Sequence, residues 1–148
     1  MFKKYKQKIN YLIKLGRYNS PSGALLLMWP CFWGTLSQFE NQLTLLKPLI
    51  LFVLGSFIMR GAGCCINDLF DRNIDKLVER TKSRPLAQNK LKIIEALIFI
   101  FIQLLLGLLI ILQFNTKIII MGCVVIPLVI IYPLIKRFSY FPQFVLGL

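Results

Sequence analysis

The stretch that decides the fold is NDLFDRNID, residues 67–75, which directly follows the apolar run PLILFVLGSFIMRGAGCCI at residues 48–66. An apolar run of this length predicts a helix that crosses a membrane. If that helix continues to residue 75, five polar side chains share an arc of about 100° on its surface. They are Arg60, Asn67, Asp68, Asp71 and Asp75. The sequence therefore predicts a carboxylate-lined helix face at a membrane boundary.

The rest of the chain is also apolar. Its 148 residues are 57% hydrophobic, with a mean hydropathy of +0.69. Apolar runs of membrane-helix length cover 22–38, 48–66, 93–113 and 118–135, and a fifth run begins near Phe138 and reaches Leu148. These runs lack the alternation of barrel strands. The predicted fold class is therefore all-α integral membrane: one domain over 1–148, a multi-helix bundle with about four spans and the start of a fifth.

Basic residues are distributed unevenly between the apolar runs. Of 18 Lys and Arg, 15 lie in residues 1–20, in 67–92 and just after the fourth run, whereas the other two links hold only Lys47 and Lys117. This positive-inside asymmetry places the N-terminus and residues 67–92 in the cytoplasm. It also accounts for the net charge of +12 without nucleic acid as a partner.

Residues 1–20 are predicted to form a basic interfacial leader. The apolar side chains that share one face of this helix are Tyr5, Ile9, Leu12 and Ile13. Two roles are open for the leader, a simple membrane anchor or a part of the substrate site.

Cysteine and histidine usage excludes several kinds of chemistry. The four cysteines all lie in apolar runs without CxxC spacing, which argues against disulfides and zinc. The chain contains no His, so the usual general base and the Ser/His and Cys/His nucleophile pairs are absent.

Three aspartates on one helix face repel one another unless their pKa values rise or a cation lies between them. Asp68, Asp71 and Asp75 follow the spacing i, i+3 and i+7, and hard oxygen ligands of this kind suit Mg²⁺. The alternative is a solvated helix end whose aspartates pair with Arg72 and Lys76. Arg60 in the same arc favours a functional site, since charge inside a membrane segment marks function.

The next segment, VERTKSRPLAQNK at residues 78–90, adds Arg80 and Arg84. Arginine binds phosphate oxygens bidentately. Aspartates for Mg²⁺ beside arginines for phosphate predict a diphosphate site, and its place at a membrane surface predicts a diphosphate on a lipid tail. The alternative is that the arginines only orient the chain, which explains their number but not the RTxxRP spacing.

The stretch RGAGCCINDLFDRNIDKLVERTKSRPLA, residues 60–87, resembles the first aspartate-rich motif of the UbiA-type intramembrane prenyltransferases, NDxxDxxxD followed by RTxxRPL. SGALLLMWPCFWG (22–34) and YPLIKRFSYFPQFVLG (132–147) are similar to the branch that acts on 4-hydroxybenzoate. The resemblance covers nearly all of the chain. It implies Mg²⁺-dependent transfer of a polyprenyl group from polyprenyl diphosphate to 4-hydroxybenzoate in ubiquinone synthesis. The expected location is the lipid bilayer of a bacterial inner membrane.

The resemblance also implies roles for the residues of the aspartate motif. Asn67, Asp71 and Asp75 would hold Mg²⁺ and, through it, the diphosphate, with Asp68 adjacent as a further catalytic carboxylate. Arg60 would lie in the cavity wall and meet the carboxylate of 4-hydroxybenzoate.

Further residues would act on the phosphates. By resemblance, Arg80 and Arg84 contact phosphate oxygens. Tyr132 and Lys136, at i and i+4 beside Pro133, resemble the pair that supports departure of the diphosphate.

Two departures from the family pattern carry expectations. Gln88 and Asn89 stand where the family usually has Gly, and Asn tolerates the left-handed backbone that such a turn requires. No acidic residue follows Glu95, so the second aspartate motif, DxxxD, is absent. We therefore expect the N-terminal half of the enzyme, inactive or nearly so alone, with exposed helix faces that include Gln103.

Two alternatives to a complete enzyme follow from the missing motif. One is a non-catalytic truncated membrane protein, the product of a decayed gene. The other is the N-terminal subunit of a split prenyltransferase, whose missing half is supplied by a second chain.

Overall fold

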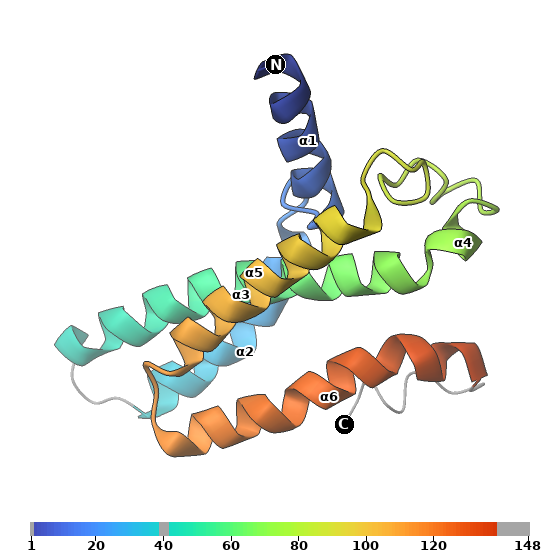
Figure 1. Ribbon diagram of the computed structural model, residues 1–148. Coiled ribbons are helices and arrows are strands. Elements are labelled where there is room, and N and C mark those ends of the chain that lie inside the picture. The colour runs from blue at the N-terminus through green and yellow to red at the C-terminus, as the bar shows by residue number, and fades with distance from the viewer. Residues whose placement is uncertain (1, 39–41, 139–148) are drawn as a thin grey trace.

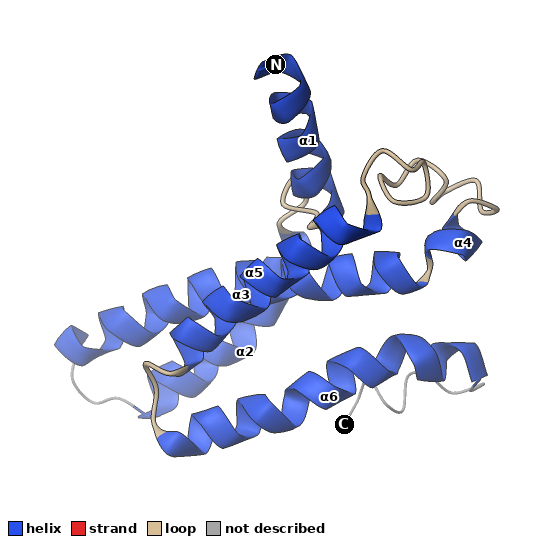
Figure 2. Cartoon of the chain, viewed as in Figure 1, coloured by secondary structure: helices blue, strands red, loops and turns tan. Residues whose placement is uncertain are grey.

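The computed structural model describes residues 2–38 and 42–138, and every regular element in these ranges is a helix (Figures 1 and 2). The elements in chain order are α1 (Phe2–Leu15), α2 (Ser22–Gln38), α3 (Gln42–Phe70), α4 (Arg72–Asp75), α5 (Ile93–Ile111) and α6 (Thr116–Phe138). The all-helical prediction is confirmed.

Each of the four predicted membrane runs lies within or nearly within one long helix, in α2, α3, α5 and α6. By length and composition, two helices can cross a membrane within the described ranges. They are Leu45–Phe70 of α3 and Ile93–Ile111 of α5, with mean hydropathies of 2.0 and 2.8. A shorter apolar stretch covers Thr116–Pro127. The count of four spans is therefore not confirmed, and the fifth predicted run lies almost entirely outside the described residues.

The long helix α3 is the centre of the bundle. It packs against α2 and α5 along its length and contacts α1, α4 and α6 more sparsely. Figure 1 shows α2, α3 and α5 running side by side, with α1 standing across one end and α6 below them. The segment 76–92 lies at the same end as α1.

The hydrophobic core gathers at that end of the bundle. Its buried members come from α1, α3, the segment 76–92 and α5, and are Leu15, Cys65, Ile66, Leu86, Leu91, Ala96 and Ile100. The segment 76–92 has little regular structure of its own, so the burial of its apolar side chains, rather than regular backbone hydrogen bonding, holds it in place. The core thus holds the sequence motif against the ends of α3 and α5.

The leader is more than a surface helix. Leu15, the last residue of α1, is fully buried, while Tyr5 and Ile9 are 63% and 55% exposed. An ion pair between Lys8 and Glu95 joins α1 to α5. The predicted apolar face is therefore divided: its first turns are exposed, and its last turns belong to the core.

Among the described residues, two that are not glycine adopt the left-handed backbone, Arg17 at φ 55° and Asn89 at φ 53°. The turn before Asn89 is closed by Asn89 N donating to Leu86 O at 3.2 Å and Lys90 N donating to Pro85 O at 2.9 Å. Asparagine is among the residues that visit this region most readily. The expectation that the turn survives without glycine is confirmed.

Candidate functional site

The aspartate motif begins where α3 ends. α3 stops at Phe70, and Asp71 has φ −82° and ψ 1°, outside helical geometry. The expectation of one helix through residue 75 is wrong in this detail. Hydrogen bonds from Asp71 N to Asn67 O at 2.9 Å and from Asp75 N to Asp71 O at 2.8 Å still join residues four apart. Because backbone hydrogen bonds between residues i and i−4 continue across the interruption, the side chains of Asp68 and Asp75 lie on the same side of the chain.

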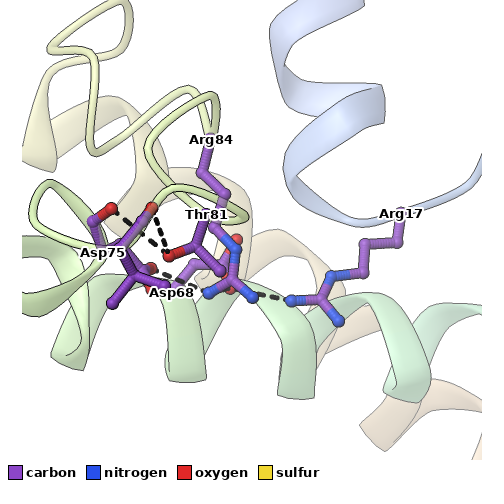
Figure 3. Close-up of polar contacts among 6 residues, drawn as sticks. Arg17, Asp68, Asp75, Thr81 and Arg84 are labelled. Carbon is purple, nitrogen blue, oxygen red and sulfur yellow. Dashed lines mark hydrogen bonds and ion pairs between the residues drawn. The ribbon is translucent and has the colours of Figure 1, made fainter.

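Arg84 lies between two of the aspartates. Its Nη1 is 2.9 Å from Asp68 Oδ1 and 2.7 Å from Asp75 Oδ2. Arg17 Nη2 is 3.1 Å from the same Asp68 oxygen. Figure 3 shows Arg17 entering from the α1 side and Arg84 from the segment 76–92 above α3. The sequence left two possibilities open, raised carboxylate pKa values or a cation between the aspartates, and the structure places two guanidinium groups against them.

The aspartates are removed from water. Asp68, Asp71 and Asp75 are 2%, 6% and 5% exposed. The solvated-end alternative is therefore wrong, because these carboxylates are buried and the ion pairs of Asp68 and Asp75 are with Arg84 and Arg17. Arg72 and Lys76 take no part in those pairs.

The RTxxRPL stretch has a physical role at nearly every position. Thr81 is buried, and its hydroxyl donates to the Asp75 carbonyl oxygen at 3.3 Å, which ties the segment to α4. Leu86 is 1% exposed in the core, next to the buried Pro85. These anchors on both sides hold the backbone of Arg84, so its guanidinium reaches the aspartates. Arg80 is exposed on the outer side of the same segment.

The predicted Mg²⁺ ligands are of a suitable chemical type, but their arrangement differs from that of a formed metal site. Asn67, Asp71 and Asp75 offer hard oxygens, the donors that Mg²⁺ prefers. Within the described part of the chain, however, no three acidic or cysteine side chains gather closely enough to hold a metal ion. In this conformation Arg84 occupies the space between Asp68 and Asp75. A metal at these oxygens therefore requires the guanidinium to turn away from Asp75.

The other predicted site residues lie further out. Arg60 is exposed, and its guanidinium lies against Gly23 at the start of α2, where a Cβ on Gly23 would be 2.5 Å from Arg60 Nε. Arg60 takes no part in the ion pairs of Asp68 and Asp75. Tyr132 and Lys136 belong to α6 by backbone, but their side chains lie outside the described ones.

Sequence reasoning missed Arg17. In the sequence, Arg17 is one of six basic residues of the leader, fifty-one positions from its partner Asp68. A weak signal is present in the sequence. Arg17 lies between the predicted leader helix and Pro21, which places it close to the start of the next helix. Nothing in the sequence, however, indicated which carboxylate it would meet.

The fold and the site define a helical membrane protein that holds a buried cluster of aspartate and arginine side chains at one end of its bundle. The model of the UbiA prenyltransferase family matches residues 27–148. The chain belongs to the UbiA prenyltransferase family.

The curated relatives carry more specific names. The chain is 48% identical over 136 residues to "4-hydroxybenzoate polyprenyltransferase, mitochondrial" of Drosophila pseudoobscura pseudoobscura, covering 91% of this chain and 34% of that protein. It is 44% identical over 148 residues to the Schizosaccharomyces pombe protein of the same name, covering 97% and 41%. It is 46% identical over 132 residues to "4-hydroxybenzoate octaprenyltransferase" of Vesicomyosocius okutanii subsp. Calyptogena okutanii, covering 89% and 48%.

The chain spans about a third to a half of the length of these curated relatives. No solved structure matches it significantly.

Proposed function

We propose that this chain forms the aspartate-rich part of an enzyme that transfers a polyprenyl group from polyprenyl diphosphate to 4-hydroxybenzoate in ubiquinone synthesis. The observation that carries the proposal is the guanidinium of Arg84 held between the buried carboxylates of Asp68 and Asp75, in a member of a prenyltransferase family. The names of the relatives support the choice of acceptor.

Arg84 is the residue that would receive the diphosphate. A guanidinium binds phosphate oxygens with the same fork of N–H groups that it uses for carboxylates, so Arg84 can exchange Asp75 for a phosphate. Leu86 and Thr81 hold its backbone, so only the side chain has to move. Arg80, exposed on the same segment, would supply a second cation to the phosphates.

The exchange makes carboxylate oxygens available. When Arg84 turns to phosphate, Asp75 loses its cation and, with Asp71 and Asn67, offers hard ligands to Mg²⁺. When bound, Mg²⁺ neutralises charge on the departing diphosphate.

The remaining steps use the apolar interior. The allylic C–O bond breaks as the diphosphate leaves, and the hydroxyl-activated ring of 4-hydroxybenzoate attacks through carbon and then loses its ring proton. Tyr132 and Lys136 of α6 would support the leaving diphosphate, and Arg60 would bind the acceptor carboxylate. Apolar helix walls would keep water from the allylic cation. Because no covalent enzyme intermediate is needed, the absence of His from the sequence agrees with this chemistry.

The proposed function is tested by ligand binding to the purified full chain in detergent. We expect farnesyl diphosphate to bind at least about tenfold more tightly with Mg²⁺ than with EDTA, because metal and arginine together neutralise the diphosphate. Farnesol is the matched ligand without charge, and its affinity should not depend on Mg²⁺. Equal affinity for farnesyl diphosphate with and without the metal would overturn the proposal.

A second polypeptide is a proposed partner for turnover. Helix side chains such as Phe101 and Met121 are 67% and 70% exposed. A helical membrane chain that carries a DxxxD motif would cover such faces and add carboxylates for a second metal ion. In the same binding assay, adding that chain should tighten farnesyl diphosphate binding and give prenylated 4-hydroxybenzoate. Unchanged binding and no product would reject this partner and favour a non-catalytic protein.

We also propose that the N-terminus and the segment 76–92 face the cytoplasm or its equivalent. Both lie at one end of the bundle, where the Lys90 ammonium is 5.5 Å from the centre of the Tyr11 ring and the Lys8–Glu95 ion pair joins α1 to the start of α5. The two links that are poor in basic residues lie at the other end, where Lys47 and Lys117 line the same pocket.

Membrane-impermeant thiol labelling tests this orientation. In a background without the four native cysteines, Lys4→Cys and Lys82→Cys are expected to label only from the basic side, and Lys117→Cys only from the opposite side. Labelling of all three positions from one side would show that the orientation is wrong.

A further inference from the structure

A second buried polar cluster lies beside the aspartate site, where three separate parts of the chain meet. The side-chain amide of Gln103, in α5, donates a hydrogen bond to the hydroxyl of Tyr18, in the turn between α1 and α2, over 2.5 Å. Gly61 of α3 leaves room for this contact, because a Cβ there would lie 2.6 Å from Gln103 Nε2 and closer still to the Tyr18 hydroxyl. The pair therefore ties the turn to α3 and α5.

Packing alone does not explain Gln103. It is 2% exposed in the middle of an apolar helix, so the expectation that this residue is exposed is wrong, although its predicted hydrogen bond between elements is present. Its Oε1 has no hydrogen-bond partner among the described residues. A buried carbonyl group left unpaired costs about 1–3 kcal/mol. Leucine would fill the space without that cost, so the hydrogen bond to Tyr18 is the contribution that requires glutamine.

The turn that Tyr18 anchors is strained. Arg17 has φ 55°, and the turn is closed by Arg17 N donating to Lys14 O and Tyr18 N donating to Ile13 O, both at 3.1 Å. This is the Schellman pattern, in which glycine is usual at the left-handed position. A side chain there costs roughly 1–2 kcal/mol. Arginine occupies the position nonetheless, and its guanidinium reaches Asp68.

Burial also keeps the anchor neutral. It raises the pKa of Tyr18 above its ordinary value of 10.0, and the hydrogen bond from Gln103 lowers it by less. The contact between Tyr18 and Gln103 therefore does not titrate near neutral pH.

We propose that Tyr18 and Gln103 are positioning residues that hold the turn so that Arg17 stays on Asp68 while Arg84 moves. Asp68 is 2% exposed and shares its Oδ1 between Arg17 and Arg84. If Arg84 left an otherwise unpaired Asp68, a buried charge would remain uncompensated, which is strongly unfavourable. Arg17 removes that obstacle, because Asp68 keeps one cation when Arg84 turns to the diphosphate. This positioning role depends on the proposed function in one respect only, that the incoming anion is a diphosphate.

The first arm of the test measures the coupling between Arg17 and Asp68 without any ligand. Reversible unfolding in SDS of Arg17→Gln, Asp68→Asn and the double variant gives the coupling, which we expect to be about tenfold in the unfolding equilibrium constant. Adding Tyr18→Phe or Gln103→Leu should reduce it to less than about twofold, because the turn is no longer held. Tyr11→Phe is the matched control, since its hydroxyl accepts from the Gln7 amide at 2.9 Å on an exposed face.

The second arm measures Mg²⁺-dependent affinity for inorganic diphosphate. Tyr18→Phe should weaken it about tenfold in the native chain and leave it nearly unchanged in an Arg17→Gln background. A purely structural role would give the same loss in both backgrounds.

The two arms separate the possible failures. An Arg17–Asp68 coupling that persists in both Tyr18→Phe and Gln103→Leu would overturn the positioning role, whatever the ligand does. If the coupling is lost in these variants but the native chain binds no diphosphate, the positioning role is supported and the proposed function is overturned.

Discussion

Replacing Arg84 by alanine should destabilise the protein by about 3–5 kcal/mol, the usual cost of removing one partner from a buried ion pair. Its guanidinium contacts Asp68 and Asp75, whose side chains are only 3% and 8% exposed. Without Arg84, Asp75 loses its ion pair with that guanidinium, whereas Asp68 retains Arg17. The loss is therefore expected mainly from Asp75. Unfolding in SDS, followed by circular dichroism, measures the change.

Arg80 provides a matched control four residues earlier. It is exposed on the same segment, and surface substitutions of this kind usually change stability by less than about 0.5 kcal/mol. Arg80→Ala should therefore unfold like the native chain. If both alanine variants unfold like the native chain, Arg84 does not hold the segment in place.

Mg²⁺ distinguishes a structural cation from one that the ligand displaces. If the carboxylates bind Mg²⁺ once Arg84 leaves, Mg²⁺ should stabilise Arg84→Ala more than the native chain. At a concentration of 100 times its dissociation constant, a bound ion adds about 2.7 kcal/mol. Equal stabilisation of both proteins would show that Arg84 and the metal do not compete.

Much of the architecture could be predicted because lipid restricts the backbone to helices or closed barrels. The apolar runs therefore locate the ends of α2, α3, α5 and α6 to within six residues. The end of α3 was harder. Local periodicity continues from Asn67 to Asp75, and the interruption at Asp71 depends on where the segment 76–92 packs.

The site was predictable in its chemistry but not in its pairing. Three carboxylates on one face predicted either raised pKa values or a cation between them, and that inference needed only electrostatics. The identity of the cations depends on tertiary structure, because Arg84 is positioned by Leu86 in the core and Arg17 by a turn that contacts α5. Arg72 and Lys76 were the nearest cations in sequence, yet the chain geometry directs other side chains to Asp68 and Asp75.

The same limit explains the error over Gln103. A polar residue in the middle of an apolar run was expected to face a missing partner. Its partner is Tyr18, eighty-five residues earlier, in a leader whose sequence indicated only a surface helix. Position along the chain gave no indication that α1 ends beside α5.

Neutralising the aspartates individually should have the largest effect on ligand binding. Asp71→Asn and Asp75→Asn each replace a hard, charged ligand by a neutral amide of the same size. We expect each to weaken Mg²⁺-dependent binding of farnesyl diphosphate by more than about 100-fold, beyond the roughly 10–100-fold that loss of an outer-shell partner costs a metal site. Calorimetry on the purified chain in detergent, with Mg²⁺ present, gives the affinities.

Glu79→Gln is the control for lost negative charge, since Glu79 is an exposed carboxylate of the same segment that pairs with Lys82 at 2.6 Å. It should bind like the native chain. Near-native affinity in both aspartate variants would reject the metal assignment and leave the aspartates as counter-ions of the arginines.

The sign of the effect without metal separates those two roles further. With EDTA, the diphosphate meets the carboxylates directly, and like charges repel. Asp75→Asn should then bind farnesyl diphosphate more tightly than the native chain, because it removes a repulsive charge and releases Arg84 from one of its two carboxylates. A carboxylate that only holds Arg84 in place would give a loss in both conditions, since the freed arginine would no longer point at the ligand. An inversion between Mg²⁺ and EDTA is therefore the result that identifies Asp75 as a residue acting through a metal ion.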